Sequence, residues 1–222
     1  MKPYYQTENG VLYNGDCLEV MKGLEPDSVD LVLTDPPYGI DEANGKNKSR
    51  SCIAKSKDYG NLSWDNSIPE KEIFQLLLTT KNQIIFGGNY FIEHLKNSPC
   101  WLVWDKLNGN NDFADCELAW ASFKTAVRKY EWRWQGMLQQ QMGQHKEERH
   151  HPTQKPIGLF YKILEDYSKD TDLILDPFLG SGTTAIVCER LGRKWIGVEI
   201  NKEYCDIAVK RIEAERAQRK LF

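Results

Sequence analysis

The clearest indication of the fold is the stretch L-I-L-D-P-F-L-G-S-G-T-T at residues 173–184. Its apolar start, 173–175, predicts a short buried strand, and a helical pattern runs from Gly182 to Leu191. Gly180 and Gly182 permit a tight turn and a close approach of the backbone to a ligand. The free N–H groups at the start of the helix favour a carboxylate. Together these features predict a ligand site of the Rossmann type.

The strand that follows this helix leads to an acidic residue. Residues 195–198 are apolar, and Glu199 follows Gly182 at nearly the spacing of about 20 residues at which Rossmann-type sites place the acidic residue that binds ribose hydroxyls. A nicotinamide dehydrogenase would have a related turn. Here, however, Ala185 stands where the dehydrogenase pattern has its third glycine, and Thr183 and Thr184 precede it. The turn alone therefore does not identify the ligand.

Strand-like and helix-like segments alternate along the chain, which predicts an α/β fold with a mostly parallel sheet and helices on both faces. The expected strands are 11–13, 29–34, 83–86, 101–104, 117–121, 173–175 and 195–198. The expected helices are 17–24, 69–80, 156–167, 182–191 and 201–219. A chain of 222 residues is long enough for one domain with a substantial core, so we predict a single domain over 1–222.

Two segments interrupt this alternation. Residues 41–61 have no apolar period and are rich in Lys, Ser, Gly and Asn, which predicts a long mobile loop. Residues 108–150 mix aromatic residues, basic residues and glutamines without a clear helix or strand pattern. Both segments are expected to extend from the alternating α/β framework.

Composition and charge narrow the function classes. The net charge is -3 and the pI is about 5.9, so nucleic-acid binding does not follow from total charge, and any basic surface must be local. The 6 cysteines form no C-x-x-C pair, which predicts reduced thiols in a cytoplasmic protein. The 4 histidines show no zinc spacing, so no metal is predicted. No apolar stretch approaches transmembrane length and the N-terminus is unlike a signal peptide, so no membrane partner is expected.

A second informative stretch, Asp35-Pro36-Pro37-Tyr38, follows the apolar run 29–34. A carboxylate at the end of such a strand lies where open α/β sheets bind their ligands. The two prolines stiffen the backbone, and neither has an N–H group. The Asp35 carboxylate and the Pro36 carbonyl can therefore form a fixed pair of acceptors, with the ring of Tyr38 beside them. Two acceptors and a stacking surface suit a planar group that carries an NH2.

This tetrapeptide resembles the catalytic motif of the amino-group DNA methyltransferases, which transfer a methyl group from S-adenosylmethionine to the exocyclic amine of adenine or cytosine. Residues 173–184 are similar to the S-adenosylmethionine loop of the same family. Residues 151–156 resemble the segment that closes over the methionine end of that cofactor, and residues 14–17 resemble an element near its adenine. The resemblance extends to 85–91 and 101–106 and covers nearly the whole chain except 41–61 and part of 108–150.

The order of the motifs adds information, because the catalytic motif precedes the cofactor loop. This is the permuted arrangement of the beta group of amino methyltransferases. The resemblance therefore implies a circularly permuted, Rossmann-like methyltransferase fold, double-stranded DNA as partner and, as is common in the family, a homodimer. It weighs against the protein-glutamine methyltransferases, which carry Asn in place of Asp35 and have the cofactor loop first.

The resemblance also assigns roles to individual residues. The expected catalytic residues are Asp35, Pro36, Pro37 and Tyr38. The expected cofactor-binding residues are Asp16, Cys17, Asp35, Thr153, Gln154, Lys155, Asp176, Phe178, Gly180, Ser181, Gly182, Thr183, Thr184, Glu199 and Ile200. Cys100 follows a proline, as does the nucleophile of the cytosine-C5 methyltransferases, but it leads into an apolar strand and is interpreted as a buried residue.

Basic residues in the two interrupting segments are candidates for contacts with DNA phosphates. They are Lys46, Lys48, Arg50, Lys124, Arg128, Lys129 and Arg133. With Trp132 and Trp134, the later residues mark 108–150 as the candidate target-recognition insertion. The alternative is an ordinary solvated or packed surface without such a role.

An amine conjugated to a purine ring is a poor nucleophile, because its lone pair is delocalised. Acceptors at Asp35 and Pro36 that hold both N–H groups would free this lone pair for in-line transfer of the methyl group. The base must first be flipped out of the duplex, and Tyr38 is the candidate for stacking on it. Asp rather than Ser in the first position favours site-specific methylation of adenine N6. Cytosine-N4 methylation, RNA methylation and a DNA-binding protein with a decayed site remain alternatives.

Overall fold

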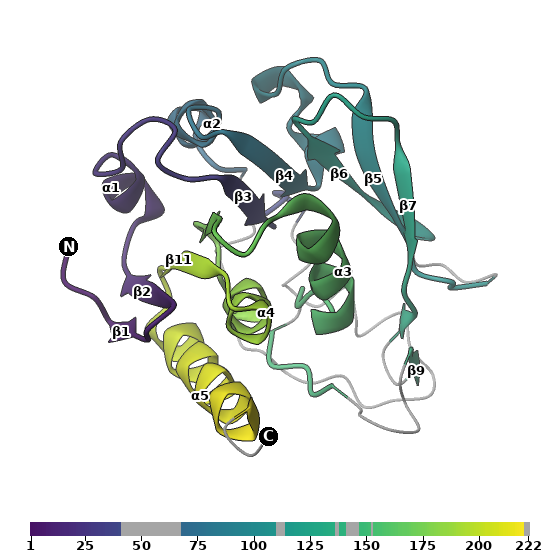
Figure 1. The fold of residues 1–222 in the computed structure, drawn as a ribbon. Helices are drawn as coiled ribbons and strands as arrows, with labels where there is room; N and C mark the ends of the chain where they lie inside the picture. The colour runs from purple at the N-terminus through teal and green to yellow at the C-terminus, as the bar shows by residue number, and fades with distance from the viewer. Residues whose placement is uncertain (41–67, 110–113, 136–137, 141–146, 152, 220–222) are drawn as a thin grey trace.

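The computed structural model describes residues 1–40, 68–109, 114–135, 138–140, 147–151 and 153–219. Within these ranges, one sheet has the strand order β1-β2-β11-β10-β3-β4-β6-β5-β7 (Figure 1). The central strands β2, β11, β10, β3 and β4 are mutually parallel. Strand β6 runs antiparallel to both of its neighbours, β4 and β5. The mostly parallel α/β sheet expected from the alternating pattern is thus confirmed.

The strands of the large sheet are short and carry the apolar runs of the sequence. They are β1 (Tyr5–Gln6), β2 (Gly10–Asn14), β3 (Leu31–Thr34), β4 (Asn82–Phe86), β5 (Cys100–Asp105), β6 (Cys116–Ala121), β7 (Arg128–Glu131), β10 (Leu173–Asp176) and β11 (Lys194–Glu199). A separate hairpin contains β8 (Trp134–Gln135) and β9 (Leu138–Gln139).

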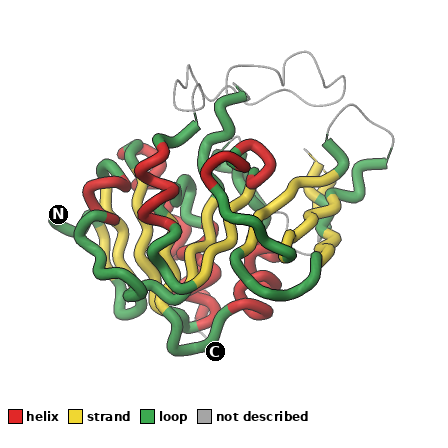
Figure 2. Tube along the Cα trace, turned by 90° about the horizontal axis from the view of Figure 1, so that it is seen from above, coloured by secondary structure: helices red, strands yellow, loops and turns green. Residues whose placement is uncertain are grey.

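Helices cover both faces of the sheet (Figure 2). Among the described residues they are α1 (Cys17–Met21), α2 (Lys71–Leu77), α3 (Ile157–Tyr167), α4 (Thr183–Leu191) and α5 (Lys202–Arg219), with the short 3-10 turns η4 (Gly88–Tyr90) and η5 (Ile92–His94). Alternate residues of β3 point to opposite sides, as the pleat requires. Leu31 and Leu33 pack with residues of α3, α4 and α5, whereas Val32 packs with residues of α1 and α2. The sheet thus separates two hydrophobic cores, one on each face.

The structure differs from the expected elements mainly at their ends. Helix α2 is shorter than predicted because Pro69 precedes its N-cap, Glu70, and the hydroxyls of Thr79 and Thr80 bond back to the carbonyls of the last turn. Strands β1 and β7 were not predicted, and β7 lies within the segment where no pattern was recognised. The predicted loop 41–61 lies outside the described residues. In the described ranges, none of the helices combines the length and apolar character needed to cross a membrane.

Candidate active site

Asp35 directly follows β3, the strand at the centre of the sheet. One oxygen of its carboxylate accepts a hydrogen bond from the Tyr38 hydroxyl at 2.6 Å. The other oxygen accepts one from the Lys155 ammonium, which also forms an ion pair with it. Burial raises the pKa of Asp35 above its ordinary value, and the charge of Lys155 limits this rise. The structure thus brings together Asp35, Tyr38 and Lys155 from two of the predicted motifs.

The Tyr38 ring is held in a defined orientation by aromatic neighbours. It stacks on Tyr90 with a centroid separation of 4.9 Å and meets Phe91 edge-on at 6.0 Å. Gly87, at the end of β4, has a φ of 68°, and a Cβ atom there would lie 2.2 Å from Tyr38 Cε1. Gly87 is therefore required both by the backbone and by the close approach of the ring. Burial raises the pKa of Tyr38 well above its usual value, so the hydroxyl stays protonated and donates to Asp35.

Lys155 connects the Asp35–Tyr38 motif to a carboxylate that was not predicted from the sequence. Its Nζ atom lies 3.2 Å from Oε2 of Glu117, a residue of β6. Glu117 Oε1 in turn lies 2.6 Å from Nζ of Lys106. Burial by itself raises the pKa of Glu117, but the two ammonium groups hold it below its usual value. The Lys155 ammonium therefore lies between the carboxylates of Asp35 and Glu117.

The glycine-rich turn links β10 to α4 as predicted. Gly180 and Gly182 have φ values of 54° and 90°. A Cβ atom on Gly182 would meet Ala208 of α5 at 3.0 Å, so this glycine also permits close helix packing. Ser181 is buried, and its hydroxyl donates to Gln154 at 3.1 Å, while the Thr183 hydroxyl donates to the Lys155 carbonyl at 3.2 Å. The turn is thus joined to the 153–156 segment.

Asp176 is buried at the end of β10 and supports this turn from inside. Its carboxylate accepts hydrogen bonds from Thr34 at 2.8 Å, Thr184 at 2.6 Å and the Phe178 N–H at 3.1 Å. Burial raises the pKa of Asp176 to about 6 despite these bonds. Its oxygens face Thr34 and α4, so in this structure Asp176 contacts the protein around the turn.

The acidic residue at the end of β11 lies beside the turn, as the spacing predicted. Glu199 accepts the N–H groups of Gly180 and Asn201, each at 2.8 Å. Burial raises its pKa to about 6. Ile200 is 70% exposed. Strand β2 pairs with β11, with Asn14 opposite Glu199, so Asp16 and Cys17 start α1 at the same edge of the sheet.

Asp16 and Cys17 differ in what they can offer to a ligand. The exposed Asp16 carboxylate caps α1 by accepting the Leu18 N–H at 2.8 Å. Cys17 is buried, and burial raises the pKa of its thiol to about 12. Asp16 is thus the more accessible of the two side chains.

The segment before Lys155 is fixed by buried polar contacts. His151 packs against the Tyr204 ring at 4.4 Å, and its Nδ1 atom accepts the Thr153 N–H at 3.3 Å. Burial, and then the charge of Lys155, lower the pKa of His151 to about 3, so the ring is neutral at pH 7. Gln154 accepts the His150 N–H at 2.9 Å. Pro152 lies outside the described residues.

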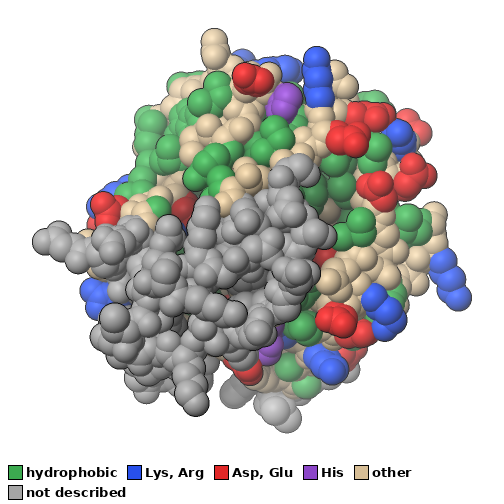
Figure 3. Space-filling view, turned by 180° about the vertical axis from the view of Figure 1, so that it is seen from behind, with side chains coloured by type: hydrophobic (Ala, Val, Ile, Leu, Met, Phe, Trp, Pro, Cys, Tyr) green, Lys and Arg blue, Asp and Glu red, His purple; other side chains and the backbone are tan. Residues whose placement is uncertain are grey.

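The structure describes only some of the residues that were predicted to contact DNA. Lys46, Lys48 and Arg50 lie outside the described residues. Lys124, Arg128 and Arg133 are exposed, whereas Lys129 is exposed but forms ion pairs with Glu131 and Asp105. On the face drawn in Figure 3, Lys and Arg side chains are scattered among Asp and Glu over the described part of the surface. That face offers no basic stripe within the described residues.

Of the two tryptophans in the expected recognition region, Trp132 is partly buried and Trp134 is buried. Trp132 lies against α3, so closely that a Cβ atom on Gly158 would be 2.0 Å from its ring. Trp134 is 7% exposed and donates to the Gln154 carbonyl at 3.1 Å. Both rings thus contact the protein in this structure, in agreement with the alternative of an ordinary packed surface. Cys100 is buried, as expected.

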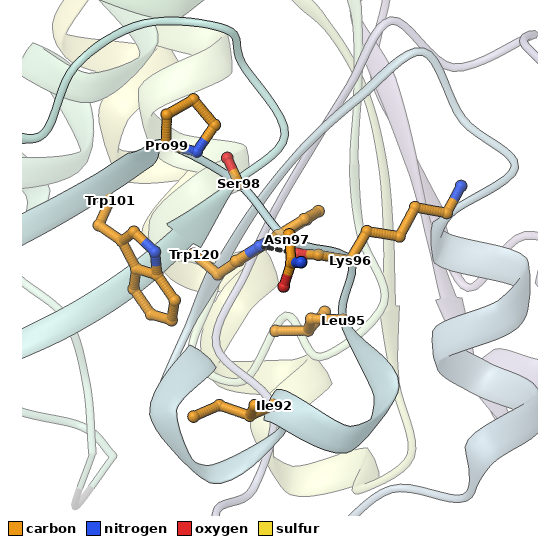
Figure 4. A pocket seen from close by; sticks show the side chains of 8 residues that line it. All are labelled: Ile92, Leu95, Lys96, Asn97, Ser98, Pro99, Trp101 and Trp120. Atoms are coloured by element: carbon orange, nitrogen blue, oxygen red, sulfur yellow. Dashed lines mark hydrogen bonds between the residues drawn. The ribbon is translucent and has the colours of Figure 1, made fainter.

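A surface pocket of about 370 Å³ lies beside η5 (Figure 4). Its wall includes Trp101 and Trp120, and the indole N–H of Trp120 donates to the Lys96 carbonyl at 2.8 Å. Asp35 and Tyr38 are not among the residues that line it. In the described ranges, His, Cys, Asp and Glu side chains form no group of three or more suited to a metal ion.

Fold and geometry define an α/β protein with a fixed carboxylate after one central strand and a glycine-rich turn after the neighbouring strand. Residues 56–210, more than half of the chain, match the family model of the N6/N4 DNA methylases. The chain belongs to this DNA methylase family. The motif Asp35–Tyr38 lies before the matched range.

Relatives cover nearly all of the chain. The Type II methyltransferase M2.LlaDCHI of Lactococcus lactis subsp. cremoris is 29% identical over 95% of this chain and 92% of its own length. M2.DpnII of Streptococcus pneumoniae is also 29% identical, over 96% of this chain and 93% of its own length. The crystal structure of the M1.HpyAVI–SAM complex has a TM-score of 0.56 at 25% identity and covers 90% of this chain and 98% of its own. The PvuII cytosine-N4-specific DNA methyltransferase shares the fold, with a TM-score of 0.62 at 21% identity, and the match covers 95% of this chain and 88% of its own.

Proposed function

We propose that this chain transfers a methyl group from S-adenosylmethionine to the N6 amine of adenine at a specific sequence in double-stranded DNA. The observation that carries this proposal is the Asp35 carboxylate, held by Tyr38 and Lys155 at the end of β3. Strand β10, which pairs with β3, ends in the glycine-rich turn. Parallel neighbours place both features at the same edge of the sheet.

The residues of the turn suit the proposed cofactor. A turn with two glycines at positive φ, followed by the N-terminus of α4, favours a carboxylate such as that of the methionine part. We assign the ribose hydroxyls to Glu199 and the region near the adenine to Asp16, Cys17 and Ile200. Bound S-adenosylmethionine supplies a methyl group that is already activated by its positively charged sulfur. The similar structure of M1.HpyAVI is a complex with SAM, which supports the assignment.

The Asp35 carboxylate and the Pro36 carbonyl are assigned as acceptors for the two N–H groups of the target amine. Acceptors at these positions would free the nitrogen lone pair and stabilise the positive charge that develops during transfer. The amine loses one proton overall, and the Asp35 carboxylate is suitably placed to accept it. Both oxygens of Asp35 already accept one hydrogen bond. The amine therefore competes with the Lys155 ammonium for one of these oxygens.

The target base is inaccessible inside a duplex, so it must leave the stack. We assign Tyr38 to contact with the flipped base, because its ring is fixed next to Asp35 by Tyr90 and Gly87. The proposal of sequence-specific DNA methylation, as in restriction-modification, rests on the relatives that are Type II methyltransferases. Aspartate as the first residue of the motif supports adenine over cytosine.

The test is incubation of the protein with S-adenosylmethionine, labelled on the methyl group, and unmethylated DNA, followed by nucleoside analysis. RNA of matched sequence serves as the control substrate. We expect label in N6-methyladenine from DNA. Label in N4-methylcytosine would transfer the proposal to the cytosine amine, and label in RNA alone or in neither nucleic acid would contradict it.

A further inference from the structure

Four charged side chains of alternating sign form a partly buried row that starts at Asp35. The row is Asp35, Lys155, Glu117 and Lys106. Lys155 is 6% exposed, and the other three side chains are between 16% and 22% exposed. Charges are rarely buried to this degree unless they are paired. The row has no net charge, which is consistent with its position inside the protein.

Lys155 is held at both ends, through its main chain and through its ammonium. Its carbonyl oxygen accepts the Thr183 hydroxyl at 3.2 Å, so its main chain is attached to the first residue of α4. Its ammonium reaches the end of β3 at Asp35 and the start of β6 at Glu117. Glu117 faces Trp104 of β5 in the sheet register, and its other oxygen is bound by Lys106. The ammonium thus lies between the Asp35 carboxylate, directly after β3, and the Glu117 carboxylate on β6.

The contact of Lys155 with Glu117 is incomplete. The distance from Nζ to Oε2 is 3.2 Å, close enough for an ion pair. Nevertheless, within the described residues this buried Oε2 atom has no hydrogen bond of acceptable angle. Glu117 therefore provides a second acceptor that is within reach and not saturated.

This arrangement addresses a difficulty in the proposed chemistry. Asp35 must accept an N–H of the target amine, but its ion pair with Lys155 competes for the same carboxylate. Removing the ammonium altogether would leave two buried carboxylates close together, which favours protonation of one of them. An ammonium that moves from one carboxylate to the other keeps both ionised. It also exposes an Asp35 oxygen to the amine.

We propose that Glu117 is a positioning residue for methyl transfer, which shares the Lys155 ammonium with Asp35 and holds it when the target amine binds to Asp35. This inference rests on the proposed function for the identity of the amine. The charge arrangement itself can be tested without any substrate. Glu117 does not contact the reacting atoms in this scheme and acts through Lys155.

The row of charges predicts that substitutions of Glu117 and Lys155 shift the pKa of Asp35 in opposite directions. Asp35 is faced by Lys155 and Tyr38, and the charges of Glu117 and Asp176 also act on it. Tyr38 stays neutral. Lys155 lowers the pKa of Asp35 and Glu117 raises it. Glu117→Gln should therefore lower the pKa of Asp35, and Lys155→Met should raise it.

The first experiment is a carboxyl ¹³C NMR titration of Asp35 in the protein without ligands. Relative to the unsubstituted protein, the midpoint is expected to rise by about 1 to 3 pH units in Lys155→Met and to fall in Glu117→Gln. Glu131→Gln is the matched control, because Glu131 is an exposed carboxylate whose ion pair with Lys129 lies on the surface. It should leave the midpoint unchanged. Shifts of the same direction in the two row variants, or no shift, would overturn the proposal.

The second experiment measures transfer to DNA. In Glu117→Gln, Lys155 has Asp35 as its only carboxylate partner in the row, so kcat should fall about 10- to 100-fold, while the Kd for S-adenosylmethionine stays within about twofold. Glu117→Asp, which keeps the charge, should recover part of the loss. Wild-type kcat in Glu117→Gln would overturn the positioning role.

Failure of this inference and failure of the proposed function are distinguishable. If the unsubstituted protein methylates adenine but Asp35 titrates alike in all variants, only the role of Glu117 is wrong. If the titrations move in opposite directions but no DNA is methylated, the shared ammonium stands and the substrate assignment is wrong. Lys155→Arg keeps the positive charge, so the midpoint of the Asp35 titration should stay as in the unsubstituted protein. This variant therefore separates a charge effect from misfolding of Lys155→Met.

Discussion

Gly87 offers the most direct test of whether the position of Tyr38 matters for activity. In Gly87→Ala, the new Cβ atom would lie 2.2 Å from Tyr38 Cε1, whereas ordinary contact begins at 3.4 Å. The ring must therefore move by about 1.2 Å, because the φ of 68° fixes the direction of the Cβ atom. A displacement of about 1 Å can cost about 100-fold in rate. The left-handed backbone adds about 1 to 2 kcal/mol of strain.

The assay is single-turnover transfer of a labelled methyl group to DNA, with cofactor binding measured by calorimetry. We expect the rate of Gly87→Ala to fall about 100-fold, which corresponds to about 2.7 kcal/mol of activation free energy. The glycine-rich turn does not contain Gly87, so the Kd for S-adenosylmethionine should be unchanged. Urea unfolding should show a loss of about 1 to 2 kcal/mol or more.

Gly192 supplies the matched control. It also has a left-handed φ, 71°, but a Cβ atom there would have no neighbour within 4 Å. Gly192→Ala therefore carries a similar backbone strain without displacing Tyr38, and it should lose stability but keep its transfer rate. Equal rates in the two variants, whether both normal or both reduced, would refute the conclusion that Gly87 acts by positioning Tyr38.

Two further predictions concern the acidic residues. Asp35→Ala should abolish transfer while calorimetry still detects cofactor binding, and loss of both together would show that the role given to Asp35 is wrong. Glu199→Ala should weaken cofactor binding, and an unchanged Kd would count against its assignment. Because burial raises the pKa of Glu199 to about 6, its protonation stabilises the folded chain, a contribution present below its unfolded pKa of about 4.5 and lost as pH rises through 6. Relative to Glu199→Gln, the wild-type free energy of unfolding should therefore fall by about 2 kcal/mol between about pH 4 and about pH 7, measured with urea.

The features that could be predicted from the sequence are those encoded locally. The apolar run before Asp35 and the run before Gly180 each specify a buried strand followed by a turn, and both strands are present in the centre of the sheet. Their alternation with helical patterns predicted the mostly parallel sheet. Cys100 was correctly interpreted because it precedes an apolar strand, and it is buried.

The features that were missed depend on residues far apart in the chain. Glu117 belongs to a strand whose pattern gives no sign of the ion pair with Lys155, which is formed only when β6 and the 153–156 segment are both in place. The local sequence around Gly87 predicts a loop, but not that Tyr38 occupies the space beside it. Trp132 and Trp134 show the same limit, because packing on α3 and Gln154 cannot be read from a mixed polar segment.

The pairing of β3 with β10 explains why two motifs so distant in sequence form one site. Ile174 and Leu175 lie opposite Leu31 and Val32, so both strands end at the same edge of the sheet. The Thr34 hydroxyl then donates to the Asp176 carboxylate at 2.8 Å, one residue before Asp35. Because Asp176 also binds Thr184 and the Phe178 N–H, this one buried side chain connects the backbone before Asp35 to both sides of the glycine-rich turn. The distance between the proposed acceptor and the proposed cofactor turn is thus set by the sheet and one carboxylate, independently of the order in which the two motifs occur along the chain.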